Sequence, residues 1–145
     1  MKLVTRNIHY AVKSLIYFSE RPGQVITVSE LVKKLKMRRA FLRRILQALS
    51  KRGILKSLKG PSGGFMLNAP ADRIRVIDIV SVFRNDMDIF DCLFEKDICP
   101  RPGRCPLMRE MIAIEKQLNS VLTRLTIKKL LNSVNKQIRQ GGMNK

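Results

Sequence analysis

The sequence predicts a mainly α-helical protein with one small β-hairpin, organised as a winged helix-turn-helix domain plus a long dimerisation helix. Apolar residues recur with helical spacing, a glycine-rich turn separates two short apolar segments, and a seven-residue apolar repeat follows. With 145 residues, 45% of them hydrophobic, the chain is long enough for one compact domain and a helical extension. We expect three regions: the winged domain at 1–84, a cysteine loop at 85–106, and dimerisation and C-terminal helices at 107–140.

The first two helices are predicted from apolar stripes and from the residues at their ends. The first helix ends at Arg21-Pro22-Gly23, and its core-facing stripe consists of Ile8, Ala11, Val12, Leu15 and Ile16. Thr27 and Glu30, three residues apart, predict a capping box at the start of the second helix. The buried face of this second helix is expected to contain Val28, Leu31, Val32 and Leu35.

A third helix is predicted after a turn near Lys36 and Met37, and Gly53 closes it. Its apolar stripe is expected to consist of Phe41, Ile45, Ala48 and Leu49. Arg39, Arg43 and Gln47 recur at intervals of four on another side. Two short helices joined by a tight turn, the second with arginines on its outer face, are typical of a helix-turn-helix that inserts into the major groove of DNA.

The segment 54–67 reads as a β-hairpin, because two short apolar stretches flank the sequence Lys-Gly-Pro-Ser-Gly-Gly. A helix-turn-helix followed by a basic hairpin is a winged helix, and this order favours DNA binding over a basic surface that is merely solvated. A plain connecting turn is the alternative for the hairpin tip. The residues expected to contact DNA are Arg38, Arg39, Arg43, Arg44, Gln47, Lys59, Ser62, Gly63 and Gly64.

Charge supports an anionic partner. The formal net charge is +18, from 29 Lys and Arg against 11 Asp and Glu. No acid occurs from residue 31 to residue 71, where eleven bases lie. The expected partner is a double-stranded DNA operator, and neither a membrane nor a small-molecule substrate is expected. The N-terminal segment lacks the pattern of a signal peptide and no apolar run is long enough to span a bilayer, so we expect a cytoplasmic protein.

The segment 72–83 is too apolar for a surface segment and is expected to pack as a fourth helix. Beyond the cysteine loop, apolar residues recur at intervals of four and three, which predicts a helix that pairs with a second copy of itself. The predicted seam is Leu107, Met111, Ile114, Leu118, Val121 and Leu125. Packing against its own domain is the alternative. Thr126 is expected to cap a last helix whose apolar side contains Ile127, Leu130, Leu131 and Val134.

The three cysteines, Cys92, Cys99 and Cys105, lie close together in a loop broken by prolines. Three thiols with no fourth to pair with favour metal or iron–sulfur ligation over a disulfide framework. Zinc and thiol redox chemistry remain alternatives, although the close cysteine pair typical of zinc sites is missing. Catalysis is not expected, because the chain has one histidine and no recognisable catalytic set of residues.

These features together resemble the Rrf2 family of winged-helix iron–sulfur transcriptional regulators, which includes IscR-like and NsrR-like proteins. The resemblance covers nearly the whole chain, through MKLVTRNIHYAVKSL, TVSELVKKLKM, FLRRILQALSKRGIL, KGPSGGFMLN, RIRVIDIV and the cysteine triplet. It implies a homodimeric regulator, expected to be a repressor, in which Cys92, Cys99 and Cys105 hold a 2Fe-2S or 4Fe-4S cluster that controls DNA affinity. The signal implied is redox state, nitric oxide, or iron and cluster supply.

The fourth cluster ligand departs from the family pattern. IscR-like members use a histidine just past the third cysteine, where this chain has Pro-Leu-Met-Arg at 106–109. NsrR-like members use an acidic residue early in the first helix of the other subunit, and the aligned position here holds His9, the only histidine. The resemblance therefore implies His9 of the partner subunit as the fourth ligand. The alternative function is a cluster-free thiol switch or a zinc-binding basic protein that binds nucleic acid.

Overall fold

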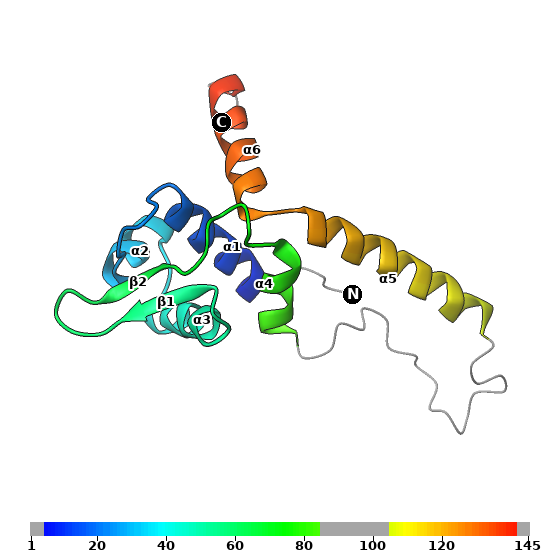
Figure 1. Ribbon diagram of the computed structural model, residues 1–145, viewed down its shortest axis with the longest axis horizontal. Coiled ribbons are helices and arrows are strands. Elements are labelled where there is room, and N and C mark those ends of the chain that lie inside the picture. The colour runs from blue at the N-terminus through cyan, green and yellow to red at the C-terminus, as the bar shows by residue number, and fades with distance from the viewer. Residues whose placement is uncertain (1–4, 85–104, 142–145) are drawn as a thin grey trace.

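The computed structural model describes residues 5–84 and 105–141, and it confirms a mainly helical fold with one two-stranded antiparallel hairpin (Figure 1). Cys92 and Cys99 lie outside the described residues. In chain order the elements are α1 (Arg6–Ser19), α2 (Val28–Leu35), α3 (Arg39–Lys51), β1 (Leu55–Leu58), β2 (Gly64–Leu67), α4 (Val76–Phe83), α5 (Pro106–Arg124) and α6 (Ile127–Gln140).

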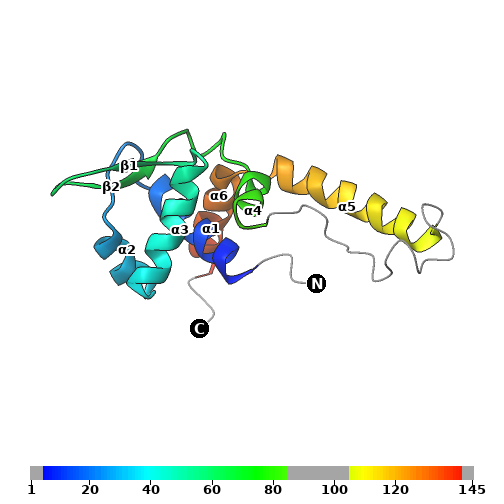
Figure 2. The ribbon, with the colours of Figure 1, turned by 90° about the horizontal axis from the view of Figure 1, so that it is seen from below.

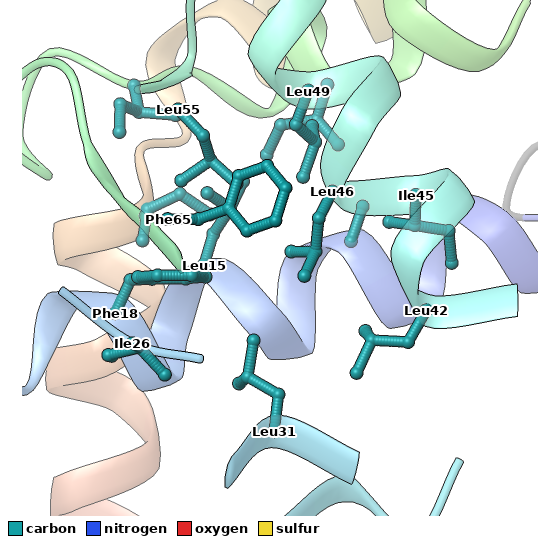
Figure 3. Close-up of a cluster of buried hydrophobic side chains, with 14 of the residues drawn as sticks. Leu15, Phe18, Ile26, Leu31, Leu42, Ile45, Leu46, Leu49, Leu55 and Phe65 are labelled. Carbon is teal, nitrogen blue, oxygen red and sulfur yellow. The ribbon is translucent and has the colours of Figure 1, made fainter. Parts of the chain in front are cut away.

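Helix α1 lies at the centre of the winged domain and contacts α2, α3, α4, α6 and β2. The Thr5 side chain caps it by accepting a hydrogen bond from the amide of Ile8. Its buried apolar residues are Ile8, Ala11, Leu15 and Phe18, so Phe18 belongs to the stripe while the predicted Val12 and Ile16 are half-buried. Figure 3 shows Leu15 and Phe18 packed among side chains of α2, α3 and the hairpin.

The helix-turn-helix is formed by α2 and α3. Thr27 caps α2 as predicted, since its side chain accepts a hydrogen bond from the amide of Glu30 at 3.1 Å. The Glu30 carboxylate, which is expected to complete a capping box with Thr27, accepts from the hydroxyl of Tyr17 instead. The turn between the helices contains Lys36 in the left-handed conformation, with φ of 52°.

The buried face of α3 differs from the predicted one by part of a turn. Leu42, Ile45, Leu46 and Leu49 are buried, whereas the predicted Phe41 and Ala48 are half-buried. Both stripes have helical spacing, and two adjacent apolar residues such as Phe41 and Leu42 cannot be ranked by spacing alone. Packing against α1 decides in favour of Leu42.

The hairpin follows α3 directly. Gly53, with φ of 77°, ends the helix, and its amide donates to the carbonyl of Ser50. Strands β1 and β2 pair antiparallel with Leu55 opposite Leu67. Ile26, just before α2, adds a second, short pairing to β2, because its amide and carbonyl both bond to Phe65 at 2.8 and 2.9 Å. This pairing ties the base of the wing to the helix-turn-helix.

Helix α4 begins at Val76 rather than at Asp72, because residues 74–76 pair with residues 125–127 at the joint between α5 and α6. The amide of Val76 donates to the carbonyl of Leu125 at 2.8 Å, and the amide of Ile127 donates to the carbonyl of Ile74 at 2.9 Å. After this joint, α6 returns to α1 and buries Ile127 and Leu131, with Thr126 as its cap as predicted.

Helix α5 extends away from the winged domain in both orthogonal views (Figures 1 and 2). None of its residues is buried within the described structure. Among the described helices, none is long and apolar enough to cross a membrane.

Glycines 63 and 64 at the end of the hairpin tip are required by close backbone approach. A Cβ at Gly63 would lie 2.4 Å from the carbonyl oxygen of Leu58, and one at Gly64 would lie 2.5 Å from that of Ile26. Real Cβ atoms essentially never come this close to backbone oxygen. Both glycines therefore have a packing role inside the protein.

We expect Gly64→Ala to destabilise the domain by about 1–3 kcal/mol, because the added methyl group forces the Ile26–Phe65 pairing apart. Urea denaturation followed by circular dichroism measures this change. Ser62→Ala, at an exposed tip position, is the control and should leave the midpoint within error. Equal stability of both variants would show that the wing base tolerates a side chain at this position.

Candidate nucleic-acid interface and cysteine segment

The outer face of α3 presents the predicted polar residues to solvent. Arg39, Arg43 and Gln47 are exposed and lie four residues apart, so they share one side of the helix. Arg38, at the N-cap, and Arg44 are also exposed, although Arg44 lies on a neighbouring side. The core contact of α3 through Leu42, Ile45, Leu46 and Leu49 leaves this polar side free to enter a groove of DNA.

All eleven bases between residues 31 and 71 are exposed. None of them forms an ion pair with an acid in the described part of the chain. The positive charge of this segment is therefore uncompensated, which favours binding to a polyanion. The eleven are Lys33, Lys34, Lys36, Arg38, Arg39, Arg43, Arg44, Lys51, Arg52, Lys56 and Lys59.

Lys59 and Ser62, at the hairpin tip, are exposed, while Gly63 and Gly64 are half-buried. The tip extends from the end of the molecule opposite to α5 in both views (Figures 1 and 2). Strand β1 contacts α3, so the hairpin is held beside that helix. The arrangement places exposed basic residues of the tip and of α3 on neighbouring elements.

The first turn of α2 connects to both adjacent helices through side chains, which the sequence did not reveal. The guanidinium Nη1 of Arg39 donates to the hydroxyl of Ser29 at 2.7 Å. The hydroxyl of Tyr17 donates to the carboxylate of Glu30 at 2.7 Å, and this hydrogen bond raises the pKa of Tyr17 above its ordinary value. Glu30 thus bonds to α1, in addition to donating its amide to Thr27.

Tyr17 is also contacted from the other side, because the guanidinium carbon of Arg21 lies 3.9 Å from the centre of its ring. A serine and a glutamate in the first turn of a helix suggest only capping, so the contacts of Ser29 and Glu30 with other helices could not be predicted from the sequence.

Cys105 is the cysteine that the structure describes, and it is the partly exposed N-cap residue of α5. The described residues contain no group of three or more side chains able to hold a metal ion. Cys105 thus marks where the cysteine loop joins α5.

His9 is exposed on α1. Its ring packs edge-on against Tyr10 with centroids 5.6 Å apart, and Tyr10 packs edge-on against Phe41 of α3 at 5.8 Å. The exposed side of α1 is therefore in aromatic contact with the helix that carries Arg39 and Arg43.

Cys105 and Ile8, the residue before His9, lie at opposite ends of α5. Ile8, next to His9, packs in a cluster with Leu122 and Leu125 at the C-terminal end of α5. Cys105 is the N-cap residue at the other end, and the 19 residues of α5 separate the two ends by about 28 Å at 1.5 Å per residue.

The predicted seam divides into residues with different environments. Leu107, Ile114 and Val121 recur every seven residues and are 65%, 47% and 53% exposed. Met111 and Leu118 are half-buried. Leu125 lies beyond the end of α5 and packs on its own domain with Ile8, Val76 and Val80. The seam prediction included Leu125 because its spacing fits, but the chain has already turned there to pair with residues 74–76.

Comparison with known proteins gives a consistent picture. A family model described as Rrf2, iron-dependent transcriptional regulator, matches residues 4–133. A protein of Aquifex aeolicus described as an HTH-type transcriptional regulator is 30% identical over 133 residues, which cover 90% of this chain and 92% of that protein. Protein aau3 of Rhizobium meliloti is 29% identical over 118 residues, covering 81% of this chain and 75% of that protein.

Solved structures share the fold. CymR (YrzC), the global cysteine regulator of B. subtilis, superimposes with a TM-score of 0.75 at 20% identity and covers 90% of this chain and 96% of its own. IscR of T. potens gives a TM-score of 0.70 at 20% identity and covers 98% of this chain and 92% of its own.

Proposed function

The chain belongs to the Rrf2 family of transcriptional regulators, whose members bind DNA as dimers, and we propose that an iron–sulfur cluster controls its affinity for an operator. The observation that carries the proposal is the combination of a winged helix with uncompensated positive charge and three clustered cysteines. The regulator acts as a repressor in this proposal.

DNA binding by α3 and the wing is supported by exposure and charge. Arg39, Arg43 and Gln47 project from one side of α3, with Arg38 and Arg44 adjacent. In this proposal α3 lies in the major groove while Lys59 and Ser62 of the wing approach the DNA backbone. Gly63 and Gly64 contribute by shaping the tip, since their lack of a side chain is already required inside the protein.

Pairing of two chains through α5 is supported by its exposed apolar line, Leu107, Ile114 and Val121. Seven-residue spacing keeps these side chains on one side of the helix, as in a two-stranded helical interface. Apolar residues this exposed are stabilised by burial against a second copy. Met111 and Leu118 flank the line, whereas Leu125 is already used within its own domain.

The chemistry of the donor set fits an iron–sulfur cluster. Cys92, Cys99 and Cys105 provide three thiolates and His9 provides an imidazole nitrogen, all ligand types found at such clusters. Cys105 is the N-cap residue of α5, and the partial positive charge of a helix N-terminus favours an anionic group there. When bound, the cluster supplies a centre that responds to redox state, nitric oxide or iron supply.

The length of α5 supports a ligand from the other chain. Cys105 lies at one end of α5, and the cluster that contains Ile8, the residue before His9, lies at the other end of this helix of about 28 Å. If two α5 helices pair antiparallel, Cys105 of one chain comes near the base of the other helix, where the partner's His9 lies. His9 would then connect the cysteine loop to α1, and the contacts of Tyr10 with His9 and Phe41 would extend this connection to α3.

A cluster-free thiol switch is the second candidate, and zinc ligation by the same cysteines belongs with it. The fold similarity to two CymR proteins supports this alternative. CymR of B. subtilis is named as the global cysteine regulator, and a structure of Staphylococcus aureus CymR is of an oxidized form. Both candidates use the same DNA-binding surface. They differ in whether the three cysteines bind an iron–sulfur cluster, bind zinc or remain as thiols.

We expect Arg43→Ala to weaken DNA binding because it removes a contact on the outer face of α3. Loss of one phosphate contact should lower the slope of log K against log salt by about 0.9, and loss of a base contact should cost about 1–3 kcal/mol at one operator position. Fluorescence anisotropy with a selected duplex and a random duplex, at several salt concentrations, measures the salt slope and the loss of affinity. Arg139→Ala on α6 is the control with the same charge change, and equal binding by the two variants would exclude Arg43 from the interface.

We expect Ile114→Glu to convert the dimer to monomer, because it places an unpaired carboxylate in the apolar line of α5. Analytical ultracentrifugation measures the mass, and circular dichroism checks that the helices persist. Ala113→Glu, on an exposed neighbouring side of the same helix, is the matched control and should remain dimeric. A dimeric Ile114→Glu protein would locate the interface elsewhere.

Cluster ligation is tested with anaerobically purified heterodimers made by co-expressing two differently tagged chains. In the first heterodimer, one chain carries Cys92→Ser, Cys99→Ser and Cys105→Ser, and the other carries His9→Ala. In the second, one chain is unchanged and the other carries all four substitutions. Ligation between chains predicts the parent visible spectrum at half intensity for the first heterodimer and an altered spectrum for the second.

An altered spectrum for the first heterodimer and the parent spectrum at half intensity for the second would show that His9 binds the cluster of its own chain. A visible spectrum with the shape of the parent spectrum in both heterodimers would exclude His9 as a ligand. A colourless parent protein that contains neither iron nor sulfide would overturn the cluster proposal and leave the thiol switch or zinc.

A further inference from the structure

We propose that Ser29 is a positioning residue for Arg39, holding its guanidinium group in the orientation that binds DNA. This inference rests on the proposed DNA-binding role of α3. It assigns a function to a residue of α2 that neither its spacing nor its charge indicates.

The contact joins the two helices of the helix-turn-helix near their N-terminal ends. Ser29 is the second residue of α2 and Arg39 is the first residue of α3. The Arg39 Nη1 donates to the Ser29 Oγ at 2.7 Å, and both residues are exposed. Ser29 thus bonds to the arginine from the protein side while solvent, or DNA, has access from the other.

The remaining donors of Arg39 are suited to recognition. A guanidinium group has five N–H donors, and the hydrogen bond to Ser29 occupies one of those on Nη1. Within the described residues, no group bonds to the edge formed by Nε and Nη2. This edge can bind a phosphate, or O6 and N7 of guanine, with two parallel hydrogen bonds. The contact therefore fixes the side chain without occupying its recognition edge.

Ser29 is itself firmly placed, because its neighbours in the first turn of α2 are bonded to other groups. The Thr27 hydroxyl accepts from the amide of Glu30 at 3.1 Å, and the Glu30 carboxylate accepts from the Tyr17 hydroxyl at 2.7 Å. Tyr17 belongs to α1, the central helix of the domain. Arg39 is therefore connected, through Ser29 and the first turn of α2, to the central helix α1.

A pre-oriented arginine loses less side-chain entropy on binding. Immobilising one flexible side chain at an interface reduces affinity by an amount that corresponds to about two- to tenfold. Removing the Ser29 hydroxyl should therefore weaken operator binding by this factor. The number of phosphate contacts stays the same, so the salt slope should not change.

The experiment compares the full-length parent, Ser29→Ala, Arg39→Ala and the double variant, all prepared anaerobically with equal iron content. The probes are the duplex that the parent selects most strongly from a random pool and a random-sequence duplex of equal length. Ser29→Thr keeps the hydroxyl and should bind like the parent. Ser133→Ala, an exposed serine on α6, is the matched control and should also bind like the parent.

We expect Ser29→Ala to weaken binding two- to tenfold in the parent background and to have no effect once Arg39 is alanine. An equal loss of affinity in both backgrounds would show that Ser29 contacts DNA directly. No loss of affinity in either background would show that the hydrogen bond does not contribute to DNA binding. Either result overturns the inference. Unchanged binding by Arg39→Ala would also overturn it. The proposed function would survive that outcome if Arg43→Ala still weakened binding.

Discussion

Burial of α1 is the constraint on which the other elements depend. Ala11 and Leu15 are completely buried and Phe18 is 1% exposed, and around them pack α2, α3, the hairpin and α6. Because the apolar sides of α3 and α6 both face this helix, their polar sides must face solvent. The exposure of Arg39 and Arg43 is therefore a consequence of core packing. The same burial offsets the mutual repulsion of a chain with a net charge of +18.

A second constraint sets the direction of α5. Residues 74–76 and 125–127 hydrogen-bond to each other, and Leu125 packs with Ile8, Val76 and Val80. The joint fixes the base of α5 against α1 and α4, so its 19 residues extend away from the domain. This geometry leaves Leu107, Ile114 and Val121 exposed and places Cys105 at the end of α5 that is remote from the Ile8 cluster. Dimerisation and ligation between chains are thus proposals that follow from one structural feature.

The side-chain contacts between helices connect the proposed sensing and binding surfaces. Tyr10 touches both His9 and Phe41, while Tyr17 and Ser29 link α1 and α3 to the first turn of α2. A movement of α1 would therefore reach α3 both directly and through α2. Such short, packed connections are the physical basis for coupling between a regulatory site and a DNA surface.

The sequence by itself determined the fold class, the caps Thr27 and Thr126, the glycine that ends α3 and the hairpin, because each depends on local backbone chemistry or on spacing along one element. Tertiary structure alone decided that Leu42 rather than Phe41 faces the core, since spacing cannot rank adjacent apolar residues. Tertiary structure also decided that Leu125 packs against its own domain and that Arg39 bonds to Ser29. These outcomes depend on how separate elements meet in space, which is set by the summed packing of the whole domain and not by the pattern of any one segment.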